Sequence, residues 1–296
     1  MSALPQTSPR FAPPGGDREF VFRSEDFRQI AAMLHADSGI YLSEQKESLV
    51  YSRLVKRLRA LGLASFKDYC ALVADHSGVQ ERQNMLAALT TNVTRFFREP
   101  HHFEYLKETV LPPLLQAAKR GGRVRIWSAG CSKGQEPYSI AMTVLSLMPD
   151  AANYDVRILA TDIDPNVLQE GRDGLYDKSE LEDMPKPERT RFFSPANGST
   201  SSFSVSDDMR RLVSFKELNL IGQWPVKGPF NVIFCRNVVI YFNEETQSKI
   251  WDRFSSLLVP QGLLCIGHSE RLSGAALPRF RPTGTTMYIH GRGGAA

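Results

Sequence analysis

The stretch RIWSAGCSKGQEPYSIAM, residues 125–142, decides the fold of this chain. An apolar run ends near Ser128, Gly130 and Gly134 follow it, and a helical pattern begins at about Pro137. Proline suits the first turn of a helix because its missing N–H is not needed there. Glycine lets the backbone pass close to a bound ligand, although many such turns are only tight turns. The stretch predicts a strand, a turn and a helix, which together form one βα unit.

The turn carries an acidic residue that bears on the choice of ligand. Its spacing is not the GxGxxG of dinucleotide-binding turns. Glu136, at the start of the helix, would repel a pyrophosphate but could attract an ammonium group. This pattern favours S-adenosylmethionine (SAM), which has an amino-acid tail and a sulfonium, over NAD.

Short apolar runs alternate with helical patterns on both sides of this stretch. Strands are expected at 124–127, 156–161, 232–235 and 263–267, and helices at 137–147, 165–171 and 244–258. Such alternation predicts an α/β domain with a parallel sheet covered on both faces. Ligands bind at the carboxyl ends of the strands in these sheets. Residues 175–211 interrupt the alternation with a Ser-rich piece, which predicts a loop or a small β insertion.

Polar residues follow two of these strands directly. Asp162 ends the second strand, where an acidic residue hydrogen-bonds ribose hydroxyls in nucleotide-binding sheets. Asp162 could instead cap a helix, but Asp164 followed by Pro165 suits that role better. Arg236 and Asn237 follow the strand at 232–235, where a ligand site is expected, although they could also be a structural arginine and a turn asparagine.

A further strand candidate ends at Asn219 and Leu220, whose backbone groups could bind the edge of an adenine.

The N-terminal third of the chain has a different pattern. Residues 1–20 are rich in Pro, Ser and Gly and predict a disordered tail, and residues 21–90 carry apolar side chains at helical spacing. A linker and linking helix follow at 91–118. Its segment TTNVTRFFREP places Asn92, Thr94, Arg95 and Arg98 around two phenylalanines, which could be plain caps and core. A cation at a domain junction could also hold a carboxylate substrate.

Composition limits the class of protein. The chain has 296 residues, 42% hydrophobic, with a net charge of +4. It shows no apolar run long enough for a membrane helix and no secretory signal, so we expect a cytoplasmic protein. No nucleic-acid-binding motif is present. His101 and His102 are sequence neighbours and make a poor metal pair, so no metal is expected. The four cysteines, at 70, 131, 235 and 265, form no CxxC pair, which predicts reduced thiols.

Six segments in order resemble one known family. They are TNVTRFFRE, AGCSKGQEPYSIAM, ATDID, LNL, CRNVVIYF and GHSERL, and the likeness runs from about residue 27 to residue 289. The chain resembles the chemotaxis receptor glutamate methyltransferases, or CheR-type enzymes. The resemblance implies an all-α domain at 21–90 and a Rossmann-like, class I SAM-dependent methyltransferase domain at 119–296. It also implies that residues 175–211 form a small antiparallel β-subdomain inserted in that domain.

The resemblance also assigns residues to the site. It implies that Arg98 lines the cofactor site from the linker and that Tyr241 faces the reacting methyl group, and we hypothesise that these two residues position the reacting groups. It implies a SAM pocket lined by Asn92, Thr94, Arg98, Gly130, Glu136, Asp162, Asn219, Leu220, Arg236 and Asn237. Lys133 stands where the family commonly has a small residue.

The implied reaction is methyl esterification of glutamates on the cytoplasmic domain of methyl-accepting chemoreceptors, with S-adenosylhomocysteine as the other product. A glutamate with a pKa of about 4.3 is ionised at neutral pH, so the reaction needs no general base. The basic helix containing Arg53, Lys56 and Arg57 is either a solvated face or a docking surface for an acidic receptor helix. The enzyme is expected to be a monomer.

Three other classes of protein compete with this interpretation. An NAD-dependent oxidoreductase is disfavoured by Glu136 and by the missing GxGxxG pattern. A non-catalytic adaptor would bind SAM and transfer nothing. A nucleic-acid amino-methyltransferase would want Asn/Asp-Pro-Pro-Tyr where residues 235–238 read Cys-Arg-Asn-Val.

Overall fold

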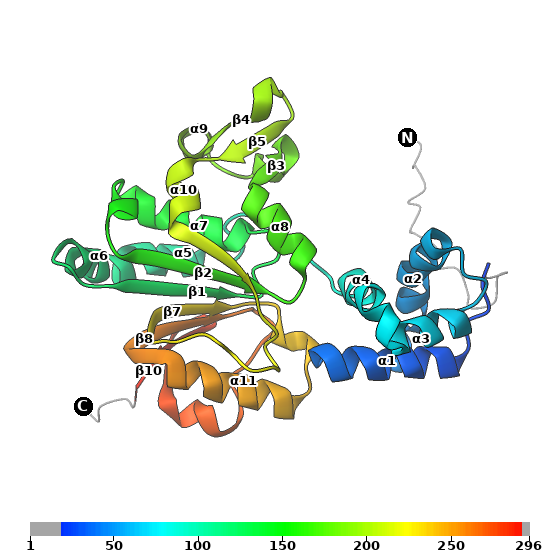
Figure 1. Ribbon diagram of the computed structural model, residues 1–296. Helices are drawn as coiled ribbons and strands as arrows, with labels where there is room; N and C mark the ends of the chain where they lie inside the picture. The colour runs from blue at the N-terminus through cyan, green and yellow to red at the C-terminus, as the bar shows by residue number, and fades with distance from the viewer. Residues whose placement is uncertain (1–18, 292–296) are drawn as a thin grey trace, which may run out of the picture. The chain divides into compact units, whose positions relative to one another are not determined.

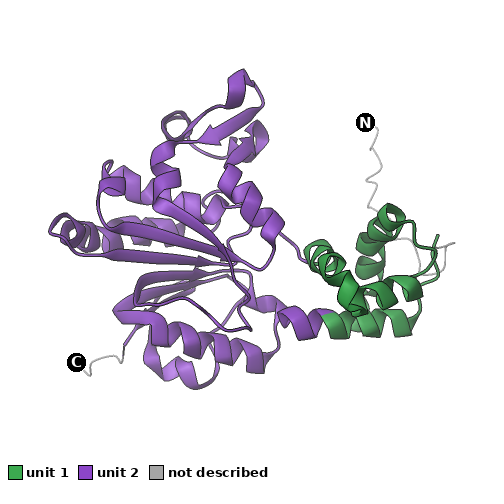
Figure 2. Ribbon diagram, in the orientation of Figure 1, with its two compact units in different colours: residues 1–33, 43–89 green, residues 34–42, 90–296 purple. Residues whose placement is uncertain are grey.

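A computed structural model describes residues 19–291, so nearly all of the predicted tail at 1–20 lies outside the described residues. The chain forms two compact units (Figure 2). Of the described residues, the first comprises 19–33 and 43–89, and the second comprises 34–42 and 90–291. No helix in the described part is both long enough and apolar enough to span a membrane.

The first unit is all helical. It contains most of α1 (Ser24–Ser38) and the whole of α2 (Glu47–Leu61), α3 (Phe66–Ala74) and α4 (Val79–Leu89). Gly62 ends α2 in the left-handed conformation (φ 65°), and Ser65 caps α3 by accepting the Asp68 N–H. The fully buried side chains that form its core are Ile30, Val50, Leu54, Leu58, Phe66, Tyr69, Val73 and Met85.

The second unit is built on a seven-stranded sheet of order β6-β2-β1-β7-β8-β10-β9. The five strands from β6 to β8 are parallel, and the last two are antiparallel. The strands are β1 (Val124–Ala129), β2 (Val156–Asp162), β6 (Val213–Glu217), β7 (Phe230–Cys235), β8 (Leu258–Ile266), β9 (Phe280–Gly284) and β10 (Met287–His290). The predicted α/β fold with a parallel sheet is confirmed, but the C-terminal hairpin of β9 and β10 was not predicted.

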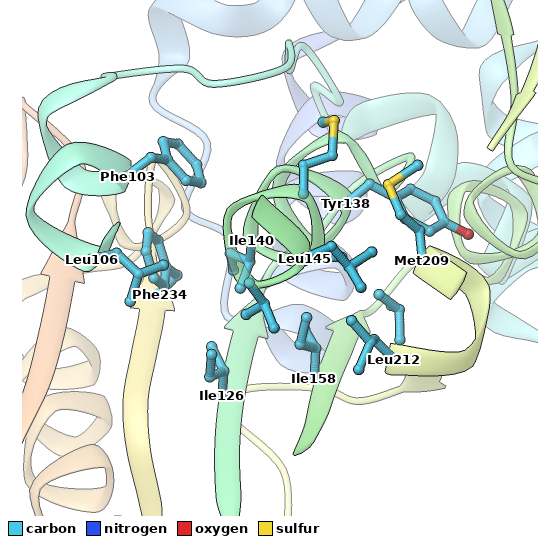
Figure 3. Packing of buried hydrophobic residues seen from close by; sticks show 14 of the residues in the cluster. Phe103, Leu106, Ile126, Tyr138, Ile140, Leu145, Ile158, Met209, Leu212 and Phe234 are labelled. Atoms are coloured by element: carbon cyan, nitrogen blue, oxygen red, sulfur yellow. The ribbon is translucent and has the colours of Figure 1, made fainter. Parts of the chain in front are cut away.

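Helices cover both faces of this sheet (Figure 1). One face packs against α5 (His101–Tyr105), α6 (Leu111–Lys119), α7 (Gln135–Leu147) and α8 (Pro165–Asp173), and the other against α11 (Glu244–Leu257). A π-helical turn, Leu106–Val110, joins α5 to α6. Successive strand residues alternate between the faces. Ile126 lies in one core cluster with Ile140 of α7 (Figure 3). Trp127 points to the other face and packs with Phe254 of α11.

The insertion at 175–211 is a small antiparallel sheet of order β3-β5-β4, as predicted. It contains β3 (Leu175–Asp177), α9 (Lys186–Phe192), β4 (Phe193–Pro195), β5 (Ser202–Val205) and α10 (Asp207–Leu212). Tyr176 and Phe193 each meet Phe96 of the linker edge to face, at centroid distances of 4.9 and 5.4 Å. The linker therefore packs against the insertion. All four cysteines are buried free thiols, which confirms that prediction.

Candidate active site

The turn after β1 is held in shape by its neighbours at the carboxyl edge of the sheet. The N–H groups of Gly130 and Cys131 both donate to the Thr161 carbonyl, at 2.7 and 2.9 Å. Gly130 has φ 79°, and a Cβ there would lie 2.2 Å from Cγ2 of Val238. Glycine is therefore required at this position by packing against the segment that follows β7. The turn thus brings the ends of β1, β2 and β7 together.

Asp162 lies at this junction. Its Oδ2 accepts the Ser132 N–H at 2.8 Å and its Oδ1 accepts the Asp164 N–H at 3.1 Å. Burial raises the pKa of Asp162, and these amide hydrogen bonds oppose that effect. Each carboxylate oxygen can take a second hydrogen bond, so Asp162 retains capacity for a hydroxyl ligand. Asp164 caps α8 by accepting the Asn166 N–H at 2.9 Å, which confirms its predicted role.

Glu136 and Arg236 form a buried ion pair. Arg236 Nε donates to Glu136 Oε2 at 2.8 Å, and the other oxygen of Glu136 accepts the Ser128 hydroxyl at 2.7 Å. The Arg236 side chain is 2% exposed and that of Glu136 is 8% exposed. Glu136 lies at the start of α7 and Arg236 directly after β7, as predicted, but their charged groups bind each other. Their contact with each other was not foreseen from the sequence.

Asn237 has an unsatisfied polar atom. Its backbone has φ 59°, and its Oδ1 is buried with no hydrogen-bond partner among the described residues. The loop that carries Asn237 is fixed by Glu270, which accepts the N–H groups of Val238 and Val239 at 2.8 and 2.9 Å. Glu270 belongs to the GHSERL segment, and its role was missed because a carboxylate that binds backbone amides leaves no local pattern.

Asn219 and Leu220 follow β6 and lie beside the end of β2, because the Leu218 N–H donates to the Asp162 carbonyl at 2.9 Å. The Asn219 side chain donates to the Asp37 carbonyl at 2.6 Å and accepts the Ile221 N–H at 3.0 Å. The Leu220 carbonyl accepts two side-chain donors, Trp224 Nε1 at 3.1 Å and Arg253 Nη1 at 3.0 Å. The Leu220 carbonyl was a candidate for binding the edge of an adenine, but both of its lone pairs are used by these two donors.

The linker residues are bound to the same edge of the sheet. Asn92 Nδ2 donates to Asp164 Oδ2 at 3.1 Å, and the Asn92 carbonyl accepts the Ser132 hydroxyl at 3.1 Å. Arg98 Nη1 donates to the Val93 carbonyl at 3.1 Å, and the Arg98 carbonyl accepts Arg236 Nη1 at 2.6 Å. The linker thus joins the ends of β2 and β7.

Thr94 and Tyr241, two more of the predicted site residues, are half-buried in the second unit. Thr94 lies in the linker, between Asn92 and Arg98. Tyr241 ends the helical turn Val239–Tyr241, and its carbonyl accepts the Tyr41 N–H at 2.8 Å. Lys133 directs its ammonium to Glu170 of α8, at 2.8 Å.

Helix α2 of the first unit carries the basic residues Arg53, Lys56 and Arg57, and two of these side chains bind groups inside the unit. Arg57 makes two hydrogen bonds to Glu81, at 2.9 and 2.5 Å, and Glu81 is only 6% exposed. Arg53 Nη1 donates to the Leu89 carbonyl at the end of α4, at 2.8 Å. Lys56 is exposed. Two of the three candidate docking residues therefore also hold the helical unit together.

Two family domains match the chain. Residues 25–90 match "CheR methyltransferase, all-alpha domain" and residues 92–289 match "CheR methyltransferase, SAM binding domain". The chain belongs to the CheR methyltransferase family. It is 58% identical over 257 residues to a "Probable chemotaxis protein methyltransferase" of Rhizobium etli, a match that covers 86% of this chain and 96% of the relative.

Two further relatives are similar over most of their length. The chain is 41% identical over 289 residues to "Chemotaxis protein methyltransferase 2" of Pseudomonas aeruginosa, covering 96% of this chain and 99% of the relative. It is 41% identical over 264 residues to the "Chemotaxis protein methyltransferase" of Escherichia coli, covering 88% of this chain and 89% of the relative. The predictions of a CheR-type fold and of a SAM-dependent methyltransferase are confirmed by this membership.

The residues at the carboxyl edge fit SAM. Asn237 Oδ1, which has no partner within residues 19–291, and the remaining acceptor capacity of Asp162 provide polar groups for a ligand rich in hydroxyl and amino groups. Both lie beside the fixed glycine turn, where ligands bind in open α/β sheets. The site residues implied by the resemblance, from Asn92 to Tyr241, remain predictions about contacts with the cofactor.

Proposed function

We propose that the chain esterifies glutamate side chains on the cytoplasmic domain of a chemoreceptor, using SAM and releasing S-adenosylhomocysteine. The observation that carries the proposal is that Asp162 ends β2, Asn237 follows β7 and the Arg98 carbonyl is bound to Arg236 after β7, in a chain that matches both CheR domains. The relatives from Rhizobium etli and Escherichia coli are named as chemotaxis protein methyltransferases, which supports a chemoreceptor substrate.

In this proposal the sheet edge holds SAM, which supplies a methyl group carried on a sulfonium. Asp162 takes the ribose hydroxyls, and Asn237 uses its free Oδ1 near the reacting end. The turn at Gly130 and the linker residues Asn92 and Thr94 close the pocket. Glu136 and Arg236 contribute through their mutual ion pair, which fixes the start of α7 against the end of β7.

The receptor glutamate is the nucleophile and needs no base, because its pKa of about 4.3 leaves it ionised at neutral pH. Arg98 orients that carboxylate by charge-assisted hydrogen bonds, and Tyr241, in the helical turn after β7, is the second positioning group. Holding the two reactants in line supplies up to about 7–11 kcal/mol in well-oriented reactions. Positioning is therefore the main contribution of the protein to the rate.

The partner surface in this proposal is basic. Exposed Lys56 makes the direct contact with an acidic receptor helix, and Arg53 and Arg57 add positive potential beside it. Each ester removes one negative charge from the receptor, which lowers repulsion between its helices. The enzyme acts in the cytoplasm as a monomer, and neither nucleic acid nor membrane insertion takes part.

Methyl-labelled SAM and receptor-containing membranes test the proposal. Label should enter a membrane protein and leave as methanol in mild base, because esters hydrolyse there and N-methyl groups do not. Base-stable label would overturn the substrate class. SAM binding without any transfer would support a non-catalytic adaptor.

A pair of arginine variants tests the role of Arg98. Arg98→Ala should lower kcat by about 100-fold, as expected for loss of a positioning group. Arg95→Ala is the matched control, because Arg95 is an exposed arginine of the same linker outside the proposed site. Equal kinetics for the two variants would remove Arg98 from the mechanism.

A further inference from the structure

A chain of buried polar side chains runs from the glycine turn to the C-terminal hairpin. Glu136 binds Arg236, Arg236 Nη1 lies 2.9 Å from His102 Nδ1, and His102 Nε2 lies 2.9 Å from Thr286 Oγ1. All four residues are at most 8% exposed, and His102 is fully buried. Water therefore does not compete for these hydrogen bonds, and each group depends on its neighbour.

The direction of each hydrogen bond follows from the donors available. A guanidinium only donates, so His102 Nδ1 must be the acceptor and Nε2 must carry the ring proton. Nε2–H then donates to Thr286 Oγ1, whose own hydrogen goes to the Thr285 carbonyl at 2.7 Å. Burial, reinforced by the charge of Arg236, lowers the pKa of His102 to about 3, so the ring is neutral in this tautomer at physiological pH.

Arg236 also holds the linker. Its Nη1 is shared between His102 Nδ1 and the Arg98 carbonyl, and its guanidinium carbon lies 5.4 Å from the centre of the Phe103 ring. If His102 did not fix Nη1 from one side, the arginine could turn about its Nε contact to Glu136. The Arg98 backbone would then lose its donor.

We propose that His102 is a positioning residue for methyl transfer: it orients Arg236, which in turn fixes the linker backbone that carries Arg98. The inference rests on the proposed function, because it assumes that Arg98 orients the substrate carboxylate. It also gives the C-terminal hairpin a role, since Thr286 holds the outer nitrogen of His102.

The cluster of Glu99, His101 and His102 could also suggest a metal site, because their ligand atoms lie within 4.8 Å of one another. The hydrogen bonds argue against that use. His102 has one lone pair, which Arg236 occupies, and its other nitrogen carries the proton. Glu99 Oε1 accepts His268 Nδ1–H at 3.0 Å. These side chains therefore use their ligand atoms for hydrogen bonds within the protein.

Two amide variants separate the two hydrogen bonds of His102. His102→Asn places a carbonyl oxygen near the position of Nδ1 and keeps an acceptor for Arg236. His102→Gln places its amide near Nε2 and keeps a partner for Thr286, but removes the acceptor that residue 102 offers to Arg236 Nη1. His101→Asn is the matched control, because His101 is the neighbouring, less buried histidine.

The inference predicts a split between these variants. His102→Gln should lower kcat about tenfold or more, and His102→Asn by less than about threefold, with thermal midpoints within a few degrees of each other. Amide hydrogen exchange of residues 92–99 should accelerate in His102→Gln and not in His102→Asn. A purely structural role would lower both midpoints and leave kcat unchanged well below them.

Three results decide the matter. Equal kcat for the Asn and Gln variants, together with unchanged exchange of the linker, would overturn the inference. Ring ¹⁵N shifts of the full-length protein should show His102 protonated at Nε2, and protonation at Nδ1 would also overturn it. If the wild-type enzyme transfers no methyl to receptor carboxyls, the proposed function fails. The amide hydrogen exchange of residues 92–99 then tests by itself whether His102 fixes the linker backbone.

Discussion

The buried ion pair of Glu136 and Arg236 tests how the second unit, called the catalytic unit below, is held together. Arg236→Met removes the donor for Glu136 Oε2, for the Arg98 carbonyl and for His102 Nδ1, all within 2.9 Å. Glu136, 8% exposed, is then left as a buried charge without its cation. Breaking a buried pair in this way costs about 3–5 kcal/mol.

A double-mutant cycle isolates the pairwise part of this loss. Glu136→Gln keeps the size of the side chain but removes its charge, so adding it to Arg236→Met removes the uncompensated carboxylate. The double variant should be more stable than the sum of the single losses predicts, with a coupling energy of about 1–3 kcal/mol.

Urea unfolding followed by tryptophan fluorescence measures this coupling selectively. The three tryptophans, Trp127, Trp224 and Trp251, all lie in the catalytic unit, so the signal reports that unit and not the helical one. Losses that add to within about 0.5 kcal/mol would refute the reasoning, because independent sites add to that precision. The hydrogen bonds of Arg236 to the linker and to His102 would then account for its effect.

Three further outcomes are expected. Gly130→Ala should weaken SAM binding, measured by calorimetry, because its Cβ would meet Val238 at 2.2 Å in a φ 79° backbone. Lys56→Glu should raise KM for the receptor and leave SAM affinity unchanged in the same titration. Burial opposes ionisation of Glu81, yet hydrogen bonds led by Arg57 hold its pKa below the ordinary value. The stability that Glu81 adds is present above about pH 4.3 and is lost as pH falls through its lowered pKa, so wild type and Glu81→Gln should converge in acid unfolding.

Much of the fold could be predicted because its signals are local. The strands that became β1, β2, β7 and β8 each carry a short, mostly apolar run, as expected for strands buried on both faces. The hairpin of β9 and β10 was missed because it is short, contains Pro282 and Gly284, and lies at the edge of the sheet, where side chains are partly exposed. Its pairing with β8 is a long-range property that no window of sequence shows.

For the candidate site, the sequence predicts a location but not the contacts that the structure shows there. Polar residues after strands identify the carboxyl edge, and Asp162 and Asn237 lie there. The partners of Arg236 could not be predicted, because Glu136, Arg98 and His102 are 100, 138 and 134 residues away in the chain. Arg57 shows the same limit: a helix with several cations reads as a solvated face, yet its partner Glu81 is buried on another helix.

The linker illustrates how these long-range contacts produce a preorganised site. Phe97 and Glu99 have φ values of 51° and 56°, a conformation that costs about 1–3 kcal/mol for a residue other than glycine. Hydrogen bonds at three consecutive residues offset this cost: the Phe97 N–H donates to Ser139 of α7 at 2.9 Å, the Arg98 carbonyl accepts from Arg236, and Glu99 accepts from His268. These bonds reach helix α7, the segment that follows β7 and the segment that follows β8. Residues 97–99 are therefore held by three contacts within the second unit, so the proposed positioning of a substrate by Arg98 would start from a fixed backbone.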